Sequence, residues 1–371
     1  MTPVRPVTPV AVAIVGTGAI ARVHAKALAD LGGQARLVAA ADVDATALAR
    51  FCADHRIPAA HASLDDLLAA HHPDLVHVCT PPGLHAAQVL ACLRAGASAL
   101  VEKPPALSLA DFDAMAAASN PGPGRPGGPW LATVFQHRFG SGARRLRALA
   151  SAGALGRPLL AVCHTTWFRD QAYFDVPWRG QWETEGGGPT MGHGIHQMDL
   201  LCYVLGDWAQ VSALARRQAR RTQTEDLSLA HVTFASGAVA SVVNSVLSPR
   251  EETYLRFDFE RATVEVTHLY GYGDEDWRIT PAPGCEADVT AAWAASGERG
   301  VPSGHRAQFA QVLRDLAEGT PPPVTPADTR RTMQLVAGIY ASAFLGRPVR
   351  PGDLSPGTPF YRRMDGSGAR W

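Results

Sequence analysis

The sequence lacks an excess of charge of either sign. Its 371 residues include 34 Lys and Arg against 34 Asp and Glu, so the formal net charge at pH 7 is zero. Proteins that bind nucleic acid or an anionic membrane surface usually carry a basic patch or a basic balance. We therefore expect neither nucleic acid nor a membrane as a partner.

The sequence also lacks long apolar runs and paired cysteines. No stretch reaches the ~18 apolar residues of a membrane span, and no apolar segment suited to a secretory signal precedes the first glycine-rich turn. The six cysteines are scattered, as expected of reduced thiols rather than of a disulfide framework. We predict a cytoplasmic protein, long enough for two domains.

Lysine is nearly absent, since Lys26 and Lys103 are the only two. Lys103 stands in a Glu-Lys-Pro sequence directly after the apolar residues 98–101, which are typical of a buried strand. An ammonium can change its protonation state and acts as a compact point charge, unlike a guanidinium. Ligands of open α/β sheets bind at the carboxyl ends of strands. We therefore interpret Lys103 as functional; a surface lysine after an edge strand is the alternative.

A glycine-rich turn follows the first predicted strand, residues 10–15. The sequence Gly16-Thr17-Gly18-Ala19-Ile20-Ala21 comes next and leads into apolar residues at helical spacing. In this strand–turn–helix context, Gly16 would permit the tight turn and Gly18 would let the backbone approach a pyrophosphate. The pyrophosphate would lie at the amino terminus of the helix.

An acidic residue follows the second predicted strand, residues 37–41. Asp42 lies about two dozen residues past the glycines, the spacing of an acid that binds ribose hydroxyls and repels a 2′-phosphate. We therefore predict NAD as the cofactor rather than NADP. The alternatives are an ordinary turn for the glycines and a helix cap for Asp42.

Strand-like and helical segments alternate through the first 135 residues, which predicts an α/β fold with a doubly wound parallel sheet. The turns after the first, fourth and fifth strands would then gather along one edge of the sheet. The first would bind pyrophosphate, and the other two would lie toward the nicotinamide. The candidate cofactor-binding residues are Gly16, Thr17, Gly18, Ala19, Ile20, Asp42, Thr80, Pro81, His85, Glu102 and Lys103.

Aromatic and charged side chains crowd together between residues 167 and 182. Sugars present apolar CH faces and a girdle of hydroxyls, so aromatic platforms beside charged forks suit them. A local aromatic core beneath a loop is the alternative. The candidate substrate-binding residues of this segment are Trp167, Arg169, Tyr173, Trp178 and Arg179.

A helix predicted over residues 192–205 carries His193, His196 and Asp199. Both imidazoles could share a face and bind a metal. No cysteine or glutamate completes a set of four ligands, so we predict no metal site. The sequence pattern of the rest of the second half predicts mainly strands.

The glycine turn, the Thr80-Pro81-Pro82 turn with His85, and the Glu-Lys-Pro strand end resemble, in order and spacing, the glucose–fructose oxidoreductase/inositol dehydrogenase (Gfo/Idh/MocA) family. The likeness continues through the glycines 186–188, His196-Gln-Met-Asp199 and residues 324–349. It implies an NAD-dependent dehydrogenase acting on a sugar, inositol or related polyol. His196 matches the family's acid/base histidine, and Lys103 would hydrogen-bond the same hydroxyl oxygen.

The resemblance also implies the domain organisation. A Rossmann domain would span residues 1–135, and an α+β domain with a large, mostly antiparallel sheet would span residues 136–371. Helix 327–345 would pack back toward the Rossmann domain, and the large sheet would join subunits in a homodimer or homotetramer. Lys103, His193, His196 and Asp199 would contact the substrate together with the aromatic segment.

One position departs from the family. Many of its dehydrogenases carry an aspartate four residues before the histidine, where this chain has Gly192, with His193 beside it. A redox-neutral reaction, with transient oxidation, elimination or epimerisation and tightly bound NAD, is therefore an alternative. A non-catalytic NAD-binding regulator is a third interpretation, and the retention of Lys103 disfavours it.

Overall fold

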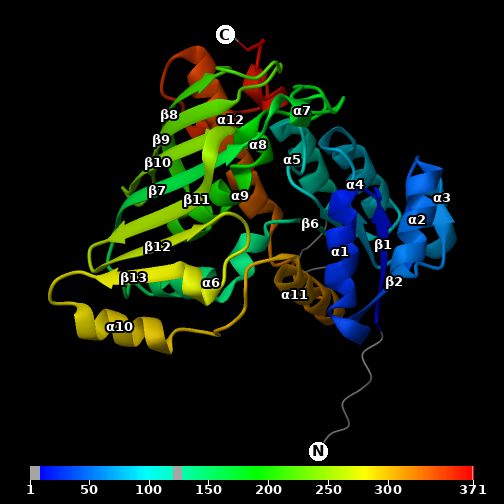
Figure 1. Cartoon of the computed structure of the whole chain (residues 1–371), viewed down its shortest axis with the longest axis horizontal. Coiled ribbons are helices and arrows are strands. Elements are labelled where there is room, and N and C mark those ends of the chain that lie inside the picture. The colour runs from blue at the N-terminus through cyan, green and yellow to red at the C-terminus, as the bar shows by residue number, and fades with distance from the viewer. Residues whose placement is uncertain (1–8, 120–127, 370) are drawn as a thin grey trace, which may run out of the picture. The chain divides into compact units, whose positions relative to one another are not determined.

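The computed structural model describes residues 9–119, 128–369 and 371 (Figure 1). The chain divides into two compact units. Unit 1 comprises Met1–Pro105, Phe112–Val134 and His305–Pro326, and unit 2 comprises Ala106–Asp111, Phe135–Gly304 and Ala327–Trp371. In the described residues, every helix is too short or too polar to cross a membrane.

Unit 1 contains a parallel sheet, which agrees with the predicted fold class. Its six described strands are ordered β3-β2-β1-β4-β5-β6, and the strand order reverses beside β1. All residues of β4 and β5 are buried, as expected of strands covered by helices on both faces. The strands are β1 (Val10–Val15), β2 (Ala35–Ala41), β3 (Ala60–His61), β4 (Leu75–Val78), β5 (Ser98–Val101) and β6 (Leu131–Thr133).

The helices of this part of the chain begin where the sequence supplies caps or turns. Asp44 accepts hydrogen bonds from the N–H groups of Thr46 and Ala47 at the start of α2, and Ser63 accepts one from Asp66 at the start of α3. The helices are α1 (Ala19–Ala29), α2 (Ala45–His55), α3 (Leu64–His71), α4 (His85–Arg94), α5 (Leu109–Ala118) and α11 (His305–Glu318).

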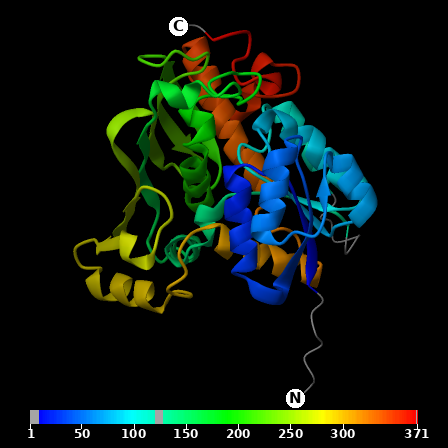
Figure 2. The ribbon, with the colours of Figure 1, turned by 45° about the vertical axis from the view of Figure 1, so that its right-hand side comes forward.

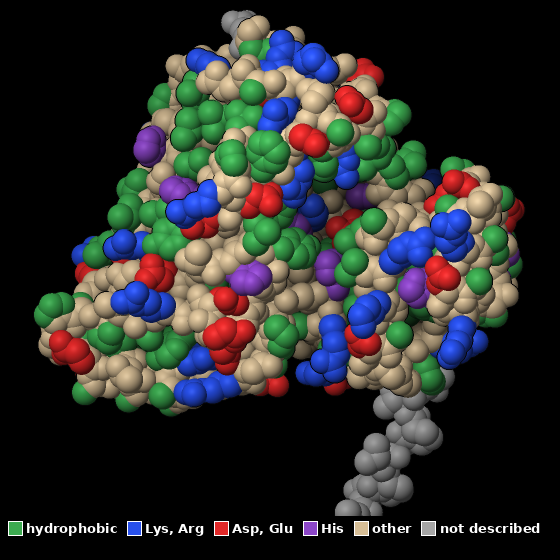
Figure 3. Space-filling model, viewed as in Figure 1, with side chains coloured by type: hydrophobic (Ala, Val, Ile, Leu, Met, Phe, Trp, Pro, Cys, Tyr) green, Lys and Arg blue, Asp and Glu red, His purple; other side chains and the backbone are tan. Residues whose placement is uncertain are grey.

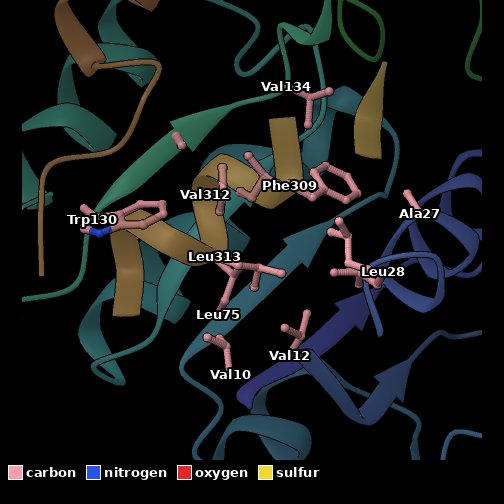
Figure 4. Packing of buried hydrophobic residues seen from close by; sticks show 13 residues of the cluster. Val10, Val12, Ala27, Leu28, Leu75, Trp130, Val134, Phe309, Val312 and Leu313 are labelled. Atoms are coloured by element: carbon pink, nitrogen blue, oxygen red, sulfur yellow. The ribbon is translucent and has the colours of Figure 1, made fainter. Parts of the chain in front are cut away.

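Helix α11 belongs to unit 1, although the predicted domain boundary assigned residues 136–371 to the second domain. Its apolar residues Phe309, Val312 and Leu313 share one buried cluster with residues of β1, α1 and β6 (Figure 4). The helix packs beside α1 (Figure 1). Burial of this apolar face, at about 25 cal/mol per Å², accounts for the return of a distant segment to the first unit.

Unit 2 is built on a mixed, mostly antiparallel sheet ordered β13-β12-β11-β7-β10-β9-β8. Only the β7–β10 pair among its described ladders is parallel. Burial alternates along β9, so that one face of the sheet is covered. The strands are β7 (Pro158–Phe168), β8 (Trp208–Arg216), β9 (Leu227–Phe234), β10 (Val239–Ser245), β11 (Leu247–Phe259), β12 (Ala262–His268) and β13 (Trp277–Pro281).

Two helices cover the buried face of this sheet (Figure 2). Helix α9 packs on β7, and Gly338 of α12 lies against Trp208 and Val211 of β8. The remaining helices are short or lie toward the ends of the sheet. The helices of this part are α6 (Ser141–Ser151), α7 (Gln171–Phe174), α8 (Pro189–Gly192), α9 (Ile195–Leu205), α10 (Glu286–Ala295), α12 (Pro326–Leu345) and α13 (Pro359–Arg362).

The predicted single helix over residues 192–205 is wrong in its first turn. Helix α8 ends at Gly192, His193 has a non-helical φ of −121° and ψ of −57°, and α9 begins at Ile195. A side chain at Gly194 would overlap the amide of Asn244 on β10, so the backbone runs close to the sheet here. His193 and His196 therefore do not share one helical face.

Candidate functional site

The glycine turn of unit 1 requires glycine at its first position. Gly16 has a φ of +83°, and its N–H donates to the carbonyl of Ala41 at 2.9 Å. A Cβ atom at this position would lie 2.8 Å from backbone atoms of Cys79 and Thr80. The turn after β1 is therefore packed directly against the turn after β4.

The start of α1 is suited to an anion. A Cβ atom at Gly18 would meet no heavy atom within 4 Å among the described residues. In the same part of the structure, no side chain caps α1 and no acidic residue occupies its first turn, which begins at Ala19 and Ile20. The first N–H groups and the helix dipole thus remain available to a negative group, which fits a pyrophosphate.

Asp42 lies at the glycine turn, as its spacing predicted. Its Oδ2 accepts hydrogen bonds from the N–H of Thr17 at 2.7 Å and the hydroxyl of Thr17 at 2.8 Å, and its Oδ1 accepts from the N–H of Asp44 at 2.9 Å. Burial opposes ionisation, but these hydrogen bonds outweigh it and lower the pKa of Asp42. An ionised carboxylate beside the turn fits an acceptor for ribose hydroxyls. The buried Thr17 side chain supports Asp42.

The turns after β4 and β5 are joined by a buried histidine. The His85 ring lies between two carbonyl oxygens, with Nε2 at 2.8 Å from that of Thr80 and Nδ1 at 2.9 Å from that of Pro104. The Thr80 hydroxyl donates to Gln88, and Pro81 leads into the short turn before α4. The predicted gathering of the three strand ends along one sheet edge is therefore observed for the backbone.

The structure surrounds Glu102 with protein groups, and its predicted role as a cofactor ligand stays a prediction. Its carboxylate is buried, and Oε1 lies 2.8 Å from Nε2 of His24 and 3.4 Å from Nε2 of His305. Its Oε2 accepts the N–H of Lys103 at 3.1 Å. Both oxygens are thus held by protein groups, and the side chain of Lys103 follows at a partly exposed position.

In unit 2, the structure brings together the predicted substrate residues of the aromatic segment. The guanidinium of Arg179 lies 3.9 Å from the ring centre of Tyr173 and 4.3 Å from that of Trp178. The Arg169 guanidinium lies 5.1 Å from the ring centre of Trp167 and 5.6 Å from that of Tyr173. We call Trp167, Arg169, Tyr173, Trp178 and Arg179 the aromatic–arginine cluster.

His193 lies against this cluster. Its ring centre is 5.1 Å from that of Trp167, and its Nε2 is 3.4 Å from the Tyr173 hydroxyl. The arginines are also charge-balanced, since Arg169 pairs with Glu251 at 2.8 Å and Arg179 with Glu185 at 3.5 Å. The cluster therefore presents apolar rings and hydrogen-bonding forks with little net charge.

His196 is buried on α9 within a second group of rings. Its centre lies 5.3 Å from that of His137 and 6.0 Å from that of Tyr270, and His137 stacks on Tyr272 at 4.7 Å. Sequence reasoning missed His137 and Tyr270. They stand far from His196 in the chain, and no local pattern connects the three residues.

Asp199 has a role that the sequence did not indicate. Its two oxygens accept a bidentate pair of hydrogen bonds from Arg138, both at 2.6 Å, and Oδ1 also accepts from the Thr332 hydroxyl at 3.0 Å. Burial alone would lower the pKa of Arg138, but the Asp199 carboxylate outweighs burial and raises it. The observed contacts make Asp199 an anchor of α9, and its predicted substrate contact stays a prediction.

Glu185 is a further carboxylate that the sequence did not single out. It is buried, its Oε2 accepts the N–H of Gly180 at 2.6 Å, and its Oε1 lies 3.7 Å from where a Cβ atom at Gly192 would stand. An acidic group is thus close to the position that departs from the family pattern.

Comparisons with known proteins agree with this geometry. A family model described as an oxidoreductase family with an NAD-binding Rossmann fold matches residues 10–120, and a GFO/IDH/MocA C-terminal domain model matches residues 143–267. D-apiose dehydrogenase of Paraburkholderia graminis is 27% identical over 94% of this chain and 91% of its own length. D-glucoside 3-dehydrogenase of Escherichia coli is 32% identical over 54% of this chain, and the match spans only 55% of that protein.

A solved structure is also similar. The WlbA dehydrogenase of Bordetella pertussis, in complex with NADH and UDP-GlcNAcA, is 27% identical with a TM-score of 0.78, over 92% of this chain and 98% of that chain. The two family models lie on the two halves of the chain in the family's order. This chain therefore belongs to the Gfo/Idh/MocA family of oxidoreductases, with an NAD-binding Rossmann fold in its N-terminal part.

Proposed function

We propose that the protein is an NAD-dependent dehydrogenase that oxidises a hydroxyl-bearing carbon of a sugar, inositol or related polyol. The observation that carries this proposal is the aromatic–arginine cluster packed against His193, three residues before His196 on the chain. Stacked rings with guanidinium forks suit the CH faces and hydroxyls of a sugar ring. The names of the relatives and the sugar nucleotide bound to WlbA support the same class of substrate.

The residues of unit 1 fit NAD. The turn at Gly16 and Gly18 and the start of α1 would hold the pyrophosphate, and the ionised Asp42 would accept hydrogen bonds from the ribose hydroxyls. Bound NAD would supply the hydride acceptor at the nicotinamide ring. Asp42 would repel a 2′-phosphate, so we expect NAD to be preferred over NADP.

His196 and Lys103 would carry the proton chemistry. An imidazole that titrates near neutrality is suited to take the hydroxyl proton of the substrate as a general base. The Lys103 ammonium would hydrogen-bond the same oxygen and stabilise the negative charge that develops on it. Each role contributes about 2–4 kcal/mol of transition-state stabilisation.

A screen of monosaccharides, inositols and glycosides for NAD reduction tests the proposal, with Lys103→Ala and His196→Ala in single-turnover assays. We expect both variants to bind NAD and to transfer hydride about 30- to 1000-fold more slowly. Near-wild-type rates with the true substrate would refute the assigned roles.

Asp42→Asn should reduce the preference for NAD over NADP about tenfold or more. Asp44→Asn is the matched control and should leave this preference unchanged.

A redox-neutral reaction is the second candidate, because Gly192 replaces the usual aspartate. It predicts NAD that co-purifies with the protein and no net change in near-ultraviolet absorbance on addition of substrate. The Glu185 carboxylate near Gly192 favours the dehydrogenase, since it offers a substitute for the missing acid. Mass analysis of the bound cofactor before and after substrate distinguishes the two.

A regulator without turnover would bind NAD, and its function would be unchanged by Lys103→Ala.

We also propose that the sheet of unit 2 joins subunits into a homodimer or homotetramer. Leu160, Leu214, Leu229 and Val239 are each 38–45% exposed although they lie on paired strands, and hydrophobic side chains reach the surface over this region (Figure 3). An apolar sheet face of this kind favours a protein partner. Light scattering on the wild type and on Leu229→Lys tests it.

All six cysteines are free, which fits the predicted cytoplasmic location.

A further inference from the structure

We propose that three buried histidines, His24, His85 and His305, are positioning residues that hold the backbone on both sides of Lys103. They come from α1, α4 and α11, three helices widely separated in the chain. The importance of Lys103 rests on the proposed function. The contacts of the three histidines with its neighbours belong to unit 1 alone.

The residue before Lys103 is held by two of these histidines. Glu102 is only 5% exposed, and its Oε1 faces Nε2 of His24 at 2.8 Å and Nε2 of His305 at 3.4 Å. Burial would raise the pKa of Glu102, but the two histidines outweigh burial and hold it well below its ordinary value. A buried carboxylate is stable only when such partners surround it. Its Oε2 then accepts the N–H of Lys103.

The direction of the hydrogen bonds follows from the groups involved. A carboxylate only accepts, so Nε2 of His24 carries the hydrogen toward Glu102. Burial lowers the pKa of His24 and of His77, which keeps both rings neutral near pH 7. Nδ1 of His24 therefore accepts, and Nδ1–H of His77 donates to it at 2.9 Å, with the Cys79 thiol 3.4 Å away. The chain His77–His24–Glu102 has one consistent proton arrangement.

The residue after Lys103 is held by the third histidine. His85 is fully buried, and its ring spans the carbonyl oxygens of Pro104 and Thr80. A carbonyl oxygen only accepts, and burial lowers the pKa of His85, so the neutral ring carries one hydrogen and donates to one of the two carbonyls while it packs against the other. The buried ring thus fills the space between the turn that carries Lys103 and the turn after β4. Glu102 is held by His24 and His305, and Pro104 lies against His85. The backbone at Lys103 therefore has few alternative conformations.

A metal site is the other interpretation of this cluster, since the ligand atoms of His24, Glu102 and His305 all lie within 4.8 Å of one another. The distance from Nε2 of His24 to Oε1 of Glu102 is 2.8 Å, which is that of a hydrogen bond. Two ligands of one tetrahedral zinc ion, each about 2.1 Å from it, stand roughly 3.4 Å apart. The 3.4 Å between Nε2 of His305 and Oε1 of Glu102 would allow this, but the 2.8 Å between His24 and Glu102 is too short for it. The geometry therefore favours hydrogen bonds.

The scarcity of lysine makes a direct test possible. Reductive methylation with a ¹³C label marks Lys26, Lys103 and the terminal amine, and dimethylated lysine keeps its charge. Lys26 is highly exposed and serves as an internal reference, while the terminal amine titrates at about pH 8 and is recognised by that. The full chain would be labelled as wild type, Glu102→Gln, His305→Gln and, as a matched control, His55→Gln on α2.

We expect Glu102→Gln to lower the apparent pKa of Lys103 by about half a unit or more, because a nearby negative charge is lost. His305→Gln should broaden or shift the Lys103 signal while the Lys26 signal stays unchanged. Hydride transfer should fall about tenfold or more in both variants, with the Kd for NAD changed less than threefold. His55→Gln should leave all these quantities unchanged.

Three results would overturn the proposal. The first is a Lys103 signal unaffected in both variants. The second is an equal loss of NAD binding and hydride transfer, which would show a merely structural role. The third is stoichiometric binding of added Zn²⁺ to the wild type that His305→Gln abolishes. If Lys103→Ala keeps full turnover, the proposed catalytic role fails, while the labelling experiment still decides whether the histidines position the lysine.

Discussion

The two units build their candidate sites in different ways. In unit 1 the groups that fit NAD are mainly backbone: a glycine turn, the start of a helix and the ends of parallel strands, with Asp42 as the main side chain. In unit 2 the candidate groups are side chains of the aromatic–arginine cluster, most of them on short or irregular segments between β7 and α9. A backbone-built site tolerates few changes of the chain path, whereas a side-chain site can vary residue by residue.

The same contrast appears in how polar groups are stabilised. In unit 1, buried histidines surround Glu102. The neutral rings of His77 and His24 are hydrogen-bonded to each other, and His24 is hydrogen-bonded to the carboxylate of Glu102. In unit 2, a buried ion pair between Arg138 and Asp199 fixes α9, which carries His196. Each candidate catalytic residue therefore has its own buried polar support, and the predictions below probe each kind.

Asp199→Ala should have the largest effect on stability. It would leave the buried guanidinium of Arg138 without its bidentate partner, and breaking such a pair costs about 3–5 kcal/mol. Denaturant unfolding measures the loss. The control Asp288→Ala removes an exposed pair with Arg261 and should leave the free energy of unfolding nearly unchanged. A stable Asp199→Ala protein with only a raised KM would contradict the anchoring role and support the predicted substrate contact.

Gly16→Ala tests the backbone-built site. The added Cβ would meet backbone atoms of Cys79 and Thr80 at 2.8 Å, at a φ of +83° that alanine adopts poorly. We expect a loss of about 2–3 kcal/mol in the free energy of unfolding and NAD binding weakened at least tenfold. Calorimetry of NAD binding checks the second effect. Gly33→Ala, where a Cβ meets no atom within 4 Å among the described residues, should change neither.

Arg179→Lys tests the side-chain site with a smaller change. Lysine keeps the charge but loses the planar contact with Tyr173 and Trp178, which is worth about 1 kcal/mol. We expect KM for the sugar to rise about fivefold, with the Kd for NAD and the thermal midpoint nearly unchanged. An unaltered KM would remove Arg179 from the substrate site.

The buried histidines of unit 1 predict a modest dependence of stability on pH. Burial lowers the pKa of His77 well below the ordinary value of 6.5, so the unfolded chain binds the proton more readily than the folded chain. The contribution of this histidine to the free energy of unfolding is therefore greatest above pH 7 and falls as the pH drops through 6.5. One such histidine lowers the free energy of unfolding by about 0.7 kcal/mol between pH 7 and pH 6. His77→Phe should reduce this slope. A slope identical to that of the wild type would contradict the assignment.

Much of unit 1 was predictable because its signals are local. The apolar run of β1, the glycines after it and the spacing to Asp42 lie within about three dozen residues of one strand–turn–helix–strand path, and strand ends at one edge follow from parallel pairing. The prediction failed at His193, since the approach of Asn244 to the backbone at Gly194 interrupts the helix. No local pattern reports a contact between residues 50 positions apart.

By itself, the sequence determined the alternation of strands and helices, the glycine turn, the acid at the end of β2 and the isolation of Lys103, because chain sterics and hydrophobic periodicity act over a few residues. The tertiary structure alone decided that α11 joins unit 1, that His24 and His305 meet at Glu102, and that Arg138 binds Asp199. These are long-range choices, set by which apolar faces pack together and by the need of each buried charge for a partner.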